Sequence, residues 1–181
     1  LLLRRQQLAL EQQVLVRTQA LEAASRALED AATSDPLTGL RNRRFLTERL
    51  DEDARLSMRQ HEEAQRQGRA ALESDLCFFM IDVDHFKAYN DHYGHQAGDY
   101  VLQRVGQLLA QVGRRPLDMA VRLGGEEFAV LLYDITPAEA QQRAESLRAA
   151  LEGLQIVHQA SLTAPLVTLS VGVACLQPAP G

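Results

Sequence analysis

The sequence of 181 residues lacks any apolar run near the ~20 residues that a membrane-spanning helix needs. Cysteine is also scarce. Only Cys77 and Cys175 occur, which is too few for a disulfide framework, and both lie in apolar runs. We therefore expect buried, reduced thiols in a cytoplasmic protein. Basic residues do not predominate either, since the net charge is −5, and this argues against a protein that coats nucleic acid.

The start of the sequence shows no secretory signal peptide, because arginines and glutamines interrupt the leucines at once. The sequence also does not begin with methionine, and it stops in residues 177–181, just after an expected strand. We therefore expect a piece of a longer protein. An upstream sensor domain is expected in that protein, and its attachment to a membrane is left open.

Residues 1–32 contain no glycine or proline and favour one long helix. Apolar positions recur along it in heptads, although two seams compete. One seam combines Gln7, Val14, Leu21 and Leu28 with Leu3, Leu10, Arg17, Ala24 and Ala31, and the other contains Leu1, Leu8 and Leu15. This pattern predicts a weak coiled coil, or a helix able to shift register, over residues 1–33. The alternative is a helix packed on its own domain.

The remaining residues, 34–181, are expected to form one domain in which strands alternate with helices. Ser34 or Asp35 is expected to cap a short turn that Pro36 starts and Gly39 stops. The further expected elements are a helix capped by Asn42 that passes Leu50 towards Gln67, strands over 78–83, 119–123, 128–133 and 166–174, and helices over about 97–112 and 137–154. This order predicts an α+β fold with one mostly antiparallel sheet flanked by helices.

Two glycines and two glutamates, Gly124–Glu127, separate the apolar runs 119–123 and 128–133. The pattern predicts a tight β-hairpin whose turn lets a ligand approach the backbone. Carboxylates gathered at such a turn favour a divalent-metal site.

A second acidic group follows the apolar run 78–81. The run predicts a strand buried on both faces. Asp82 and Asp84 lie two residues apart and are expected on one face of it. Two strands that end in acid are typical of palm-like sheets that hold Mg²⁺ for nucleotidyl transfer.

Several ordered motifs resemble those of the GGDEF family of diguanylate cyclases, in its GGEEF form. They are Asp35–Arg44, Asp82–Lys87 with Asn90, Asp91, Gly94 and His95, then Gly98 with Asp99, and Arg122–Phe128. The resemblance covers about residues 35–174. It implies condensation of two GTP molecules to cyclic di-GMP with release of pyrophosphate. It also implies a homodimer in which each protomer presents one GTP to the other.

The resemblance implies that Asp82 and Glu126, with the carbonyl of Val83, hold Mg²⁺ or Mn²⁺, two ions per active site. Glu126 is expected to accept the proton as well, and Glu127 to support the metal or the base. Lys87 would neutralise triphosphate charge. The alternative interpretation of the two glutamates is a pair of solvated hairpin acids.

Guanine recognition is expected from Asn90 and Asp99, which can match its donor and acceptor edges. Phe86 belongs to the same nucleotide-binding stretch, where backbone amides can hold phosphates. His95 contacts the nucleotide or orders the turn, and Arg122 is a second phosphate ligand. Three alternatives stay open. Lys87 and Arg122 could form surface ion pairs, and Asp99 could be a plain helix N-terminal acid.

Arg115 and Asp118 have the RxxD spacing of the family's inhibitory site, so we expect cyclic di-GMP to bind there and inhibit. For Asp35, Arg41, Asn42 and Arg43 we expect capping and ion pairing. The family's last helix, which helps hold GTP phosphates, does not follow Ala174. Two other functions are considered, a catalytically silent receptor for cyclic di-GMP and a dimerising interaction module.

Overall fold

The computed structural model describes residues 2–50, 52, 76–113, 117–133 and 135–176. The chain divides into two compact units, Leu1–Ser34 and Asp35–Gly181. None of the helices in the described ranges is long and apolar enough to cross a membrane.

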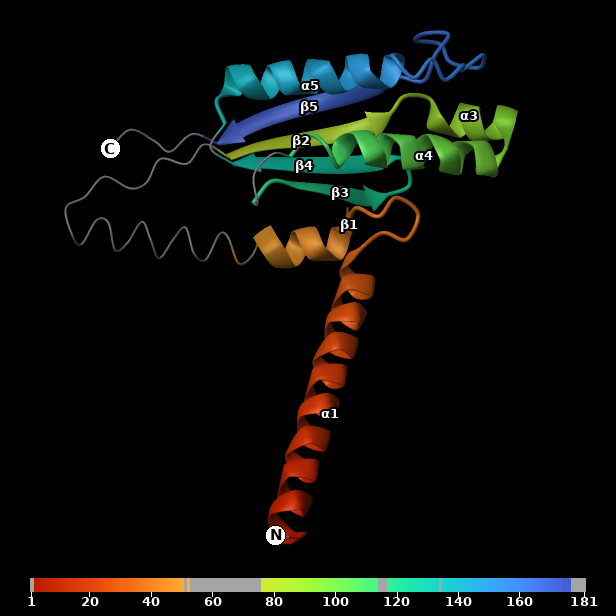
Figure 1. Cartoon of the computed structure of the whole chain (residues 1–181). Coiled ribbons are helices and arrows are strands. Elements are labelled where there is room, and N and C mark those ends of the chain that lie inside the picture. Colours follow the sequence, from red (N-terminus) through yellow and green to blue (C-terminus); the bar gives the residue numbers. More distant parts are fainter. Residues whose placement is uncertain (1, 51, 53–75, 114–116, 134, 177–181) are drawn as a thin grey trace, which may run out of the picture. The chain divides into compact units, whose positions relative to one another are not determined.

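The first unit is the single helix α1, Leu2–Thr33, as the sequence predicts (Figure 1). Three side chains of the first seam are exposed, Val14 by 56%, Leu21 by 71% and Leu28 by 72%. Leu15 of the competing seam is 57% exposed. Both seams therefore present apolar side chains to solvent. The coiled coil requires a second chain and stays a prediction.

The second unit is built on a five-stranded sheet in the order β1-β3-β4-β2-β5 (Figure 1). Its strands are Arg41–Asn42 (β1), Leu76–Val83 (β2), Met119–Gly124 (β3), Glu127–Tyr133 (β4) and Leu169–Leu176 (β5). Neighbouring strands pair antiparallel, except β1 and β3, which pair parallel. The predicted α+β fold is thus confirmed. The sequence misses β1 because two residues show no periodicity.

One face of the sheet packs against the helices α3 (Phe86–Tyr93), α4 (His95–Leu109) and α5 (Pro137–Glu152). Alternate side chains of β2 and β4 supply the strand side of this core, as the two-residue period of a strand requires. α5 begins with a capping box in which Thr136 and Glu139 bind each other's backbone amides. The predicted helices over 97–112 and 137–154 correspond to α4 and α5.

Residues 43–50 are helical and pack against the other face of the sheet. The side chain of Asn42 accepts a hydrogen bond of 3.1 Å from the amide of Phe45, which is the predicted cap. Leu46 is buried there in one cluster with Val121. The predicted continuation towards Gln67 lies outside the described residues.

β2 is fully buried on one face only; on the other, Leu76 and Phe78 are half-buried and Met80 is exposed, so the prediction of burial on both faces is wrong. Phe79 and Ile81 are fully buried, whereas Met80 between them is 48% exposed. The reason is that the apolar cluster around Leu46, as far as the described residues show, does not extend to Met80.

The segment between β2 and α4 contains the helix α3, which is not among the elements expected from the sequence. Phe86 and Tyr89 are the buried residues of this eight-residue helix. Two apolar anchors in a short polar segment give too little periodicity to predict a helix.

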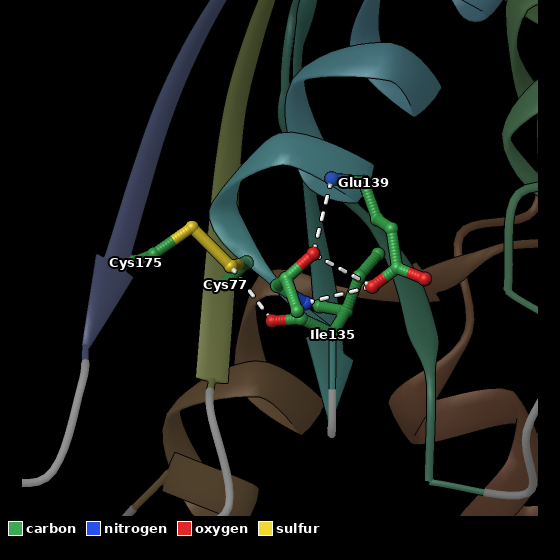
Figure 2. Close-up of a disulfide and its surroundings, with 5 residues drawn as sticks. Cys77, Ile135, Glu139 and Cys175 are labelled. Atoms are coloured by element: carbon green, nitrogen blue, oxygen red, sulfur yellow. Dashed lines mark hydrogen bonds between the residues drawn. A yellow bond between two sulfur atoms is a disulfide. The ribbon is translucent and has the colours of Figure 1, made fainter.

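Cys77 and Cys175 form a disulfide between β2 and β5, so the prediction of two reduced thiols is wrong (Figure 2). They are direct partners in the antiparallel register, with 4.1 Å between their Cα atoms. Each cysteine alone looks like a small core residue, and only the register of the strands brings the two together. The sulfur of Cys77 lies 3.7 Å from the carbonyl oxygen of Ile135, next to the start of α5.

Candidate functional site

The hairpin between β3 and β4 matches the prediction from the glycine and glutamate pattern. Gly124 and Gly125 have φ angles of 144° and 54°, which residues other than glycine rarely adopt. A Cβ on either glycine would meet no atom within 4 Å, so the turn faces open space. At its tip Glu126 is half-buried and Glu127 is exposed. The turn thus presents two carboxylates on a backbone that a ligand can approach.

Asp82 lies opposite this hairpin, because it pairs with Glu127 in the register of β2 and β4. Burial raises the pKa of the Asp82 carboxyl, and the negative charges of Glu126, Glu127 and Asp84 raise it further. The structure therefore gathers like charges that a cation would relieve. Among the described residues, however, no three histidine, cysteine, aspartate or glutamate side chains form a group that could hold a metal ion. Asp82 and Glu126 remain the donor pair to test.

Asp84 has a different environment from Asp82. Its two carboxylate oxygens accept hydrogen bonds of 2.6 Å from the hydroxyls of Thr168 and Ser170 on the β5 side. Its amide donates to the carbonyl of Thr168 at 3.0 Å. Both oxygens of Asp84 thus serve to hold the end of β2 against β5.

The turn that follows leads from Asp84 into α3. His85 adopts the left-handed conformation, with φ of 56°, and α3 starts at the next residue without a side-chain cap. Phe86 is buried at 7% exposure, whereas Lys87 is exposed. The lysine of the predicted phosphate site is therefore free to reach a ligand in solvent.

Asn90 and Asp99, predicted to contact guanine, and His95, predicted to contact the nucleotide or order the turn, lie on α3 and α4. Asn90 is on α3, and His95 and Asp99 lie exposed in the first turns of α4. The Oδ1 atom of Asn90 is buried and has no hydrogen-bond partner in the described part of the chain. A Cβ on Gly98 would lie only 1.8 Å from this atom, so the glycine makes room for it. Asn90 thus offers an unsatisfied acceptor close to Gly98, the residue before Asp99.

Arg122 connects the hairpin turn to the start of the domain. Its guanidinium donates to both carboxylate oxygens of Asp35, at 3.1 and 3.2 Å, and to the carbonyl of Gly125 at 2.8 Å. The side chain is only 13% exposed. The alternative interpretation of Arg122 was an ion pair instead of a phosphate contact, and the structure contains such an ion pair. Binding of phosphate by Arg122 stays a prediction.

Asp35 also caps the predicted turn, since its carboxylate accepts from the amide and the hydroxyl of Thr38 at 2.9 and 2.7 Å. Burial alone would raise the pKa of this carboxyl. The hydrogen bonds from Thr38 and the neighbouring Arg122 outweigh burial and hold the pKa below its ordinary value. Asp35 is therefore a charged structural group that fixes the hairpin through Arg122.

Of the predicted inhibitory pair, Arg115 lies outside the described residues. Asp118 accepts a hydrogen bond of 3.1 Å from the amide of Tyr133, which places it beside the end of β4. The inhibitory role of the pair stays a prediction.

Sequence reasoning missed the residues near β5 that form hydrogen bonds with the turn after β2. They are His158 and Thr163 in the segment before β5, together with Thr168 and Ser170. The one available signal was a pair of hydroxyl residues, Thr168 and Ser170, in an otherwise apolar strand. Because residues two apart share a strand face, that signal indicates a polar contact, although it does not name the partner.

Comparisons with known proteins give a consistent result. The family model described as diguanylate cyclase, GGDEF domain, matches residues 32–181. Diguanylate cyclase DgcP of Pseudomonas aeruginosa is 37% identical over an alignment of 170 residues that covers 84% of this chain and 23% of that protein. Response regulator PleD of Caulobacter vibrioides is 36% identical over 145 residues, 80% of this chain and 29% of that protein. The chain thus spans less than a third of the length of these relatives.

Solved structures are similar as well. The coiled coil and GGDEF domain of DgcB from Caulobacter crescentus, in complex with c-di-GMP, matches with a TM-score of 0.67 and 28% identity. The match covers 94% of this chain and 85% of that one. Diguanylate cyclase SiaD from Pseudomonas aeruginosa, in complex with its activator SiaC, matches with a TM-score of 0.59 and 33% identity. That match covers 98% of this chain and 68% of the other.

Proposed function

Because the chain belongs to the GGDEF family of diguanylate cyclases, we propose that its domain joins two molecules of GTP into cyclic di-GMP and releases pyrophosphate. The observation that supports this proposal most is the acidic cluster at the end of β2. There the carboxylates of Asp82, Glu126 and Glu127 lie close enough for their charges to raise the pKa of Asp82. A divalent cation bound between these carboxylates would offset their mutual repulsion.

Members of the family generally need a divalent metal, and the donors present here fit one. Asp82 and Glu126, with the carbonyl of Val83, would hold Mg²⁺ or Mn²⁺, and we propose two ions in each active site. One or two carboxylates suffice to bind Mg²⁺, because substrate phosphates supply further oxygen ligands. Such a site needs no group of three metal-binding side chains, and the described residues contain none. When bound, the metal lowers the pKa of the attacking 3′-hydroxyl and offsets charge on the α-phosphate.

The side chains of this protein supply the proton acceptor and the positive charge that the reaction also needs. Glu126 accepts the proton of the 3′-hydroxyl, since it is the half-buried acid at the tip of the hairpin. Glu127 supports it from the neighbouring strand position. Lys87, exposed on α3, pairs with the triphosphate and with the charge that develops on the leaving pyrophosphate.

Guanine specificity is proposed to come from Asn90 and Asp99. The carboxylate of Asp99 accepts the N1–H and N2–H donors of guanine, and the amide of Asn90 fits the remaining edge. The buried Oδ1 of Asn90, which has no partner in the described ranges, supports this role because the second N2–H of guanine would satisfy it. Adenine would leave these groups unpaired and is therefore rejected. His95 and Phe86 complete the proposed nucleotide site.

The reaction needs a second protomer, because one site presents one GTP. We propose that α1 pairs two chains and that each chain supplies half of the catalytic site. Arg115 and Asp118 are proposed to bind cyclic di-GMP and to inhibit the enzyme. The whole protein, of which this chain is a part by comparison with its relatives, would place an input domain upstream of α1.

The test is to incubate the full-length protein with GTP and Mg²⁺ and to look for cyclic di-GMP by chromatography with mass detection. We expect product from GTP, none from ATP, and none when the metal is chelated. Binding of cyclic di-GMP without turnover would identify a receptor instead. Binding of neither nucleotide would leave a dimerising interaction module.

A further inference from the structure

The turn between β2 and α3 is in contact with a segment that lies just before β5 in the sequence. Residues 156–167 of this segment fold back on themselves, with a bridge between Val157 and Leu166 and a hydrogen bond of 2.8 Å from the amide of His158 to the carbonyl of Pro165. The segment therefore has a defined backbone that can support its neighbours.

This segment contacts His85 at two points. The Nε2 atom of His158 donates to the carbonyl of His85 at 3.2 Å, because a carbonyl can only accept. The same carbonyl accepts the first backbone hydrogen bond of α3, from the amide of Tyr89 at 3.0 Å. The imidazole of His85 lies 2.9 Å from the hydroxyl of Thr163. His85 is thus held through both its backbone and its side chain.

The conformation of His85 explains why such support is needed. Its φ of 56° lies in the left-handed region, which non-glycine residues occupy at a cost unless their surroundings fix them. The preceding residue, Asp84, is fixed by Thr168 and Ser170. The following residues begin α3 and lead to Lys87.

Burial singles out His158. Among the described residues, the buried polar or charged ones are His158, at 1% exposure, and Thr168, at 6%, and both contact this turn. The ring of His158 also meets Tyr89 of α3 edge-on, with 5.1 Å between centroids. Its Nδ1 atom is buried without a partner in the described part of the chain. A residue that only filled space here would be apolar, since burying a polar ring is costly.

We propose that His158 is a positioning residue for the triphosphate of GTP. By holding the carbonyl of His85, it fixes the turn that connects the metal donors at Asp82 and Val83 to Lys87. This inference rests on the proposed function, because it concerns how the same site holds GTP. His158 itself does not touch the substrate.

The variant that tests this is His158→Phe, which keeps an aromatic ring against Tyr89 and removes the donor. We expect the KM for GTP to rise about tenfold, the size of effect that loss of one buried hydrogen bond can produce, with a smaller change in kcat. His158→Gln restores a donor near the Nε2 position and is expected to recover most of the affinity. The matched control is His92→Phe, an exposed position on the same helix as Lys87, with unchanged kinetics.

A wild-type KM in His158→Phe would overturn the proposal, and so would a failure of His158→Gln to recover affinity in a folded protein. If His158→Phe does not fold, His158→Leu replaces it, because leucine also removes the Nε2 donor and keeps the position apolar. A wild-type KM in that variant would likewise overturn the proposal.

Amide hydrogen exchange tests the role of His158 independently of the proposed function, because the measurement requires no enzymatic turnover. In His158→Phe the amides of Asp84 and Tyr89, which donate to the carbonyls of Thr168 and His85, are expected to exchange about tenfold faster, while the centre of β2 keeps its protection. If the wild type makes no cyclic di-GMP, the proposed function fails and this result still supports the positioning role. Unchanged exchange at Asp84 and Tyr89 would overturn it.

Discussion

Arg122 shows how single residues determine the shape of the candidate site. Its guanidinium joins the carboxylate of Asp35 to the carbonyl of Gly125, so the turn that carries Glu126 is fixed to the start of the domain. The planar fork of an arginine suits two partners at once, which a lysine could not hold in the same way. To bind phosphate, this guanidinium would have to exchange these contacts for the ligand.

The Asp35–Arg122 pair leads to a prediction about stability and pH. The folded-state pKa of Asp35 is below its ordinary value, so the charged form stabilises the fold at pH values above the pKa of the unfolded chain. This stability is lost as the pH falls through the folded pKa. We expect Asp35→Asn to lower the free energy of unfolding by about 1–2 kcal/mol at pH 7. The gap to the wild type should close in acid below about pH 4.

The control for that measurement is Glu48→Gln, which removes an exposed ion pair with Arg44. Denaturant unfolding at several pH values should show a change of less than about 0.5 kcal/mol for this variant. A constant difference between Asp35→Asn and the wild type across the acid range would contradict the assignment of a charged Asp35.

Gly98 gives a second prediction at the same scale. Alanine in place of a glycine within a helix favours the helix by about 0.5–1 kcal/mol, yet here the new methyl group would displace the amide of Asn90. We expect Gly98→Ala to leave thermal stability near that of the wild type and to weaken GTP binding about tenfold. Asn90→Ala should weaken binding similarly, and the double variant should add little. Additive losses in a binding titration would show that the two residues act separately.

The elements of the fold differ in how far the sequence could predict them. α1, α4, α5 and the β3–β4 hairpin were predictable because each has its own periodicity, cap or glycine turn. The eight residues of α3 were not, since only Phe86 and Tyr89 mark its buried side. The exposure of Met80 was also not predictable, because it depends on what covers the far face of β2.

The residues of the candidate site also differ in how far the sequence could predict them. The hairpin acids and Asp82 were predictable from local patterns of glycine, acid and apolar runs. The environment of Asp84 was not, because its partners Thr168 and Ser170 follow it by 84 and 86 residues. The left-handed His85 and its contact with His158 depend in the same way on tertiary packing. Local sequence thus predicts the groups that would do chemistry better than the groups that position them.

The disulfide between β2 and β5 allows a prediction at the level of elements. It closes a loop with a sequence separation of 98 residues, and cross-links of this kind stabilise proteins by about 2–4 kcal/mol. We expect Cys175→Ser to lower the midpoint of thermal unfolding. A reducing agent should lower the wild type to a similar midpoint and should leave the variant unchanged. Two titratable thiols in the native, non-reduced protein would contradict the disulfide.

For the whole molecule, our proposal requires α1 to bring two chains together. Its exposed Val14, Leu21 and Leu28 lie seven residues apart, so they form a stripe that a second helix can cover. We expect the wild type to be a dimer in sedimentation. Replacing all three residues by serine should shift it towards the monomer and reduce turnover by the same fraction. A monomeric variant with full activity would exclude a catalytic dimer.

The central claim is that Glu126 acts with Asp82 in the conversion of GTP to cyclic di-GMP. The most direct measurement compares turnover of full-length wild type, Glu126→Gln and the control Glu145→Gln, an exposed acid on α5, with GTP and Mg²⁺. We predict that Glu126→Gln lowers the rate at least roughly 100-fold, the range expected for loss of a general base, while Glu145→Gln matches the wild type. Undiminished product formation by Glu126→Gln would contradict the claim.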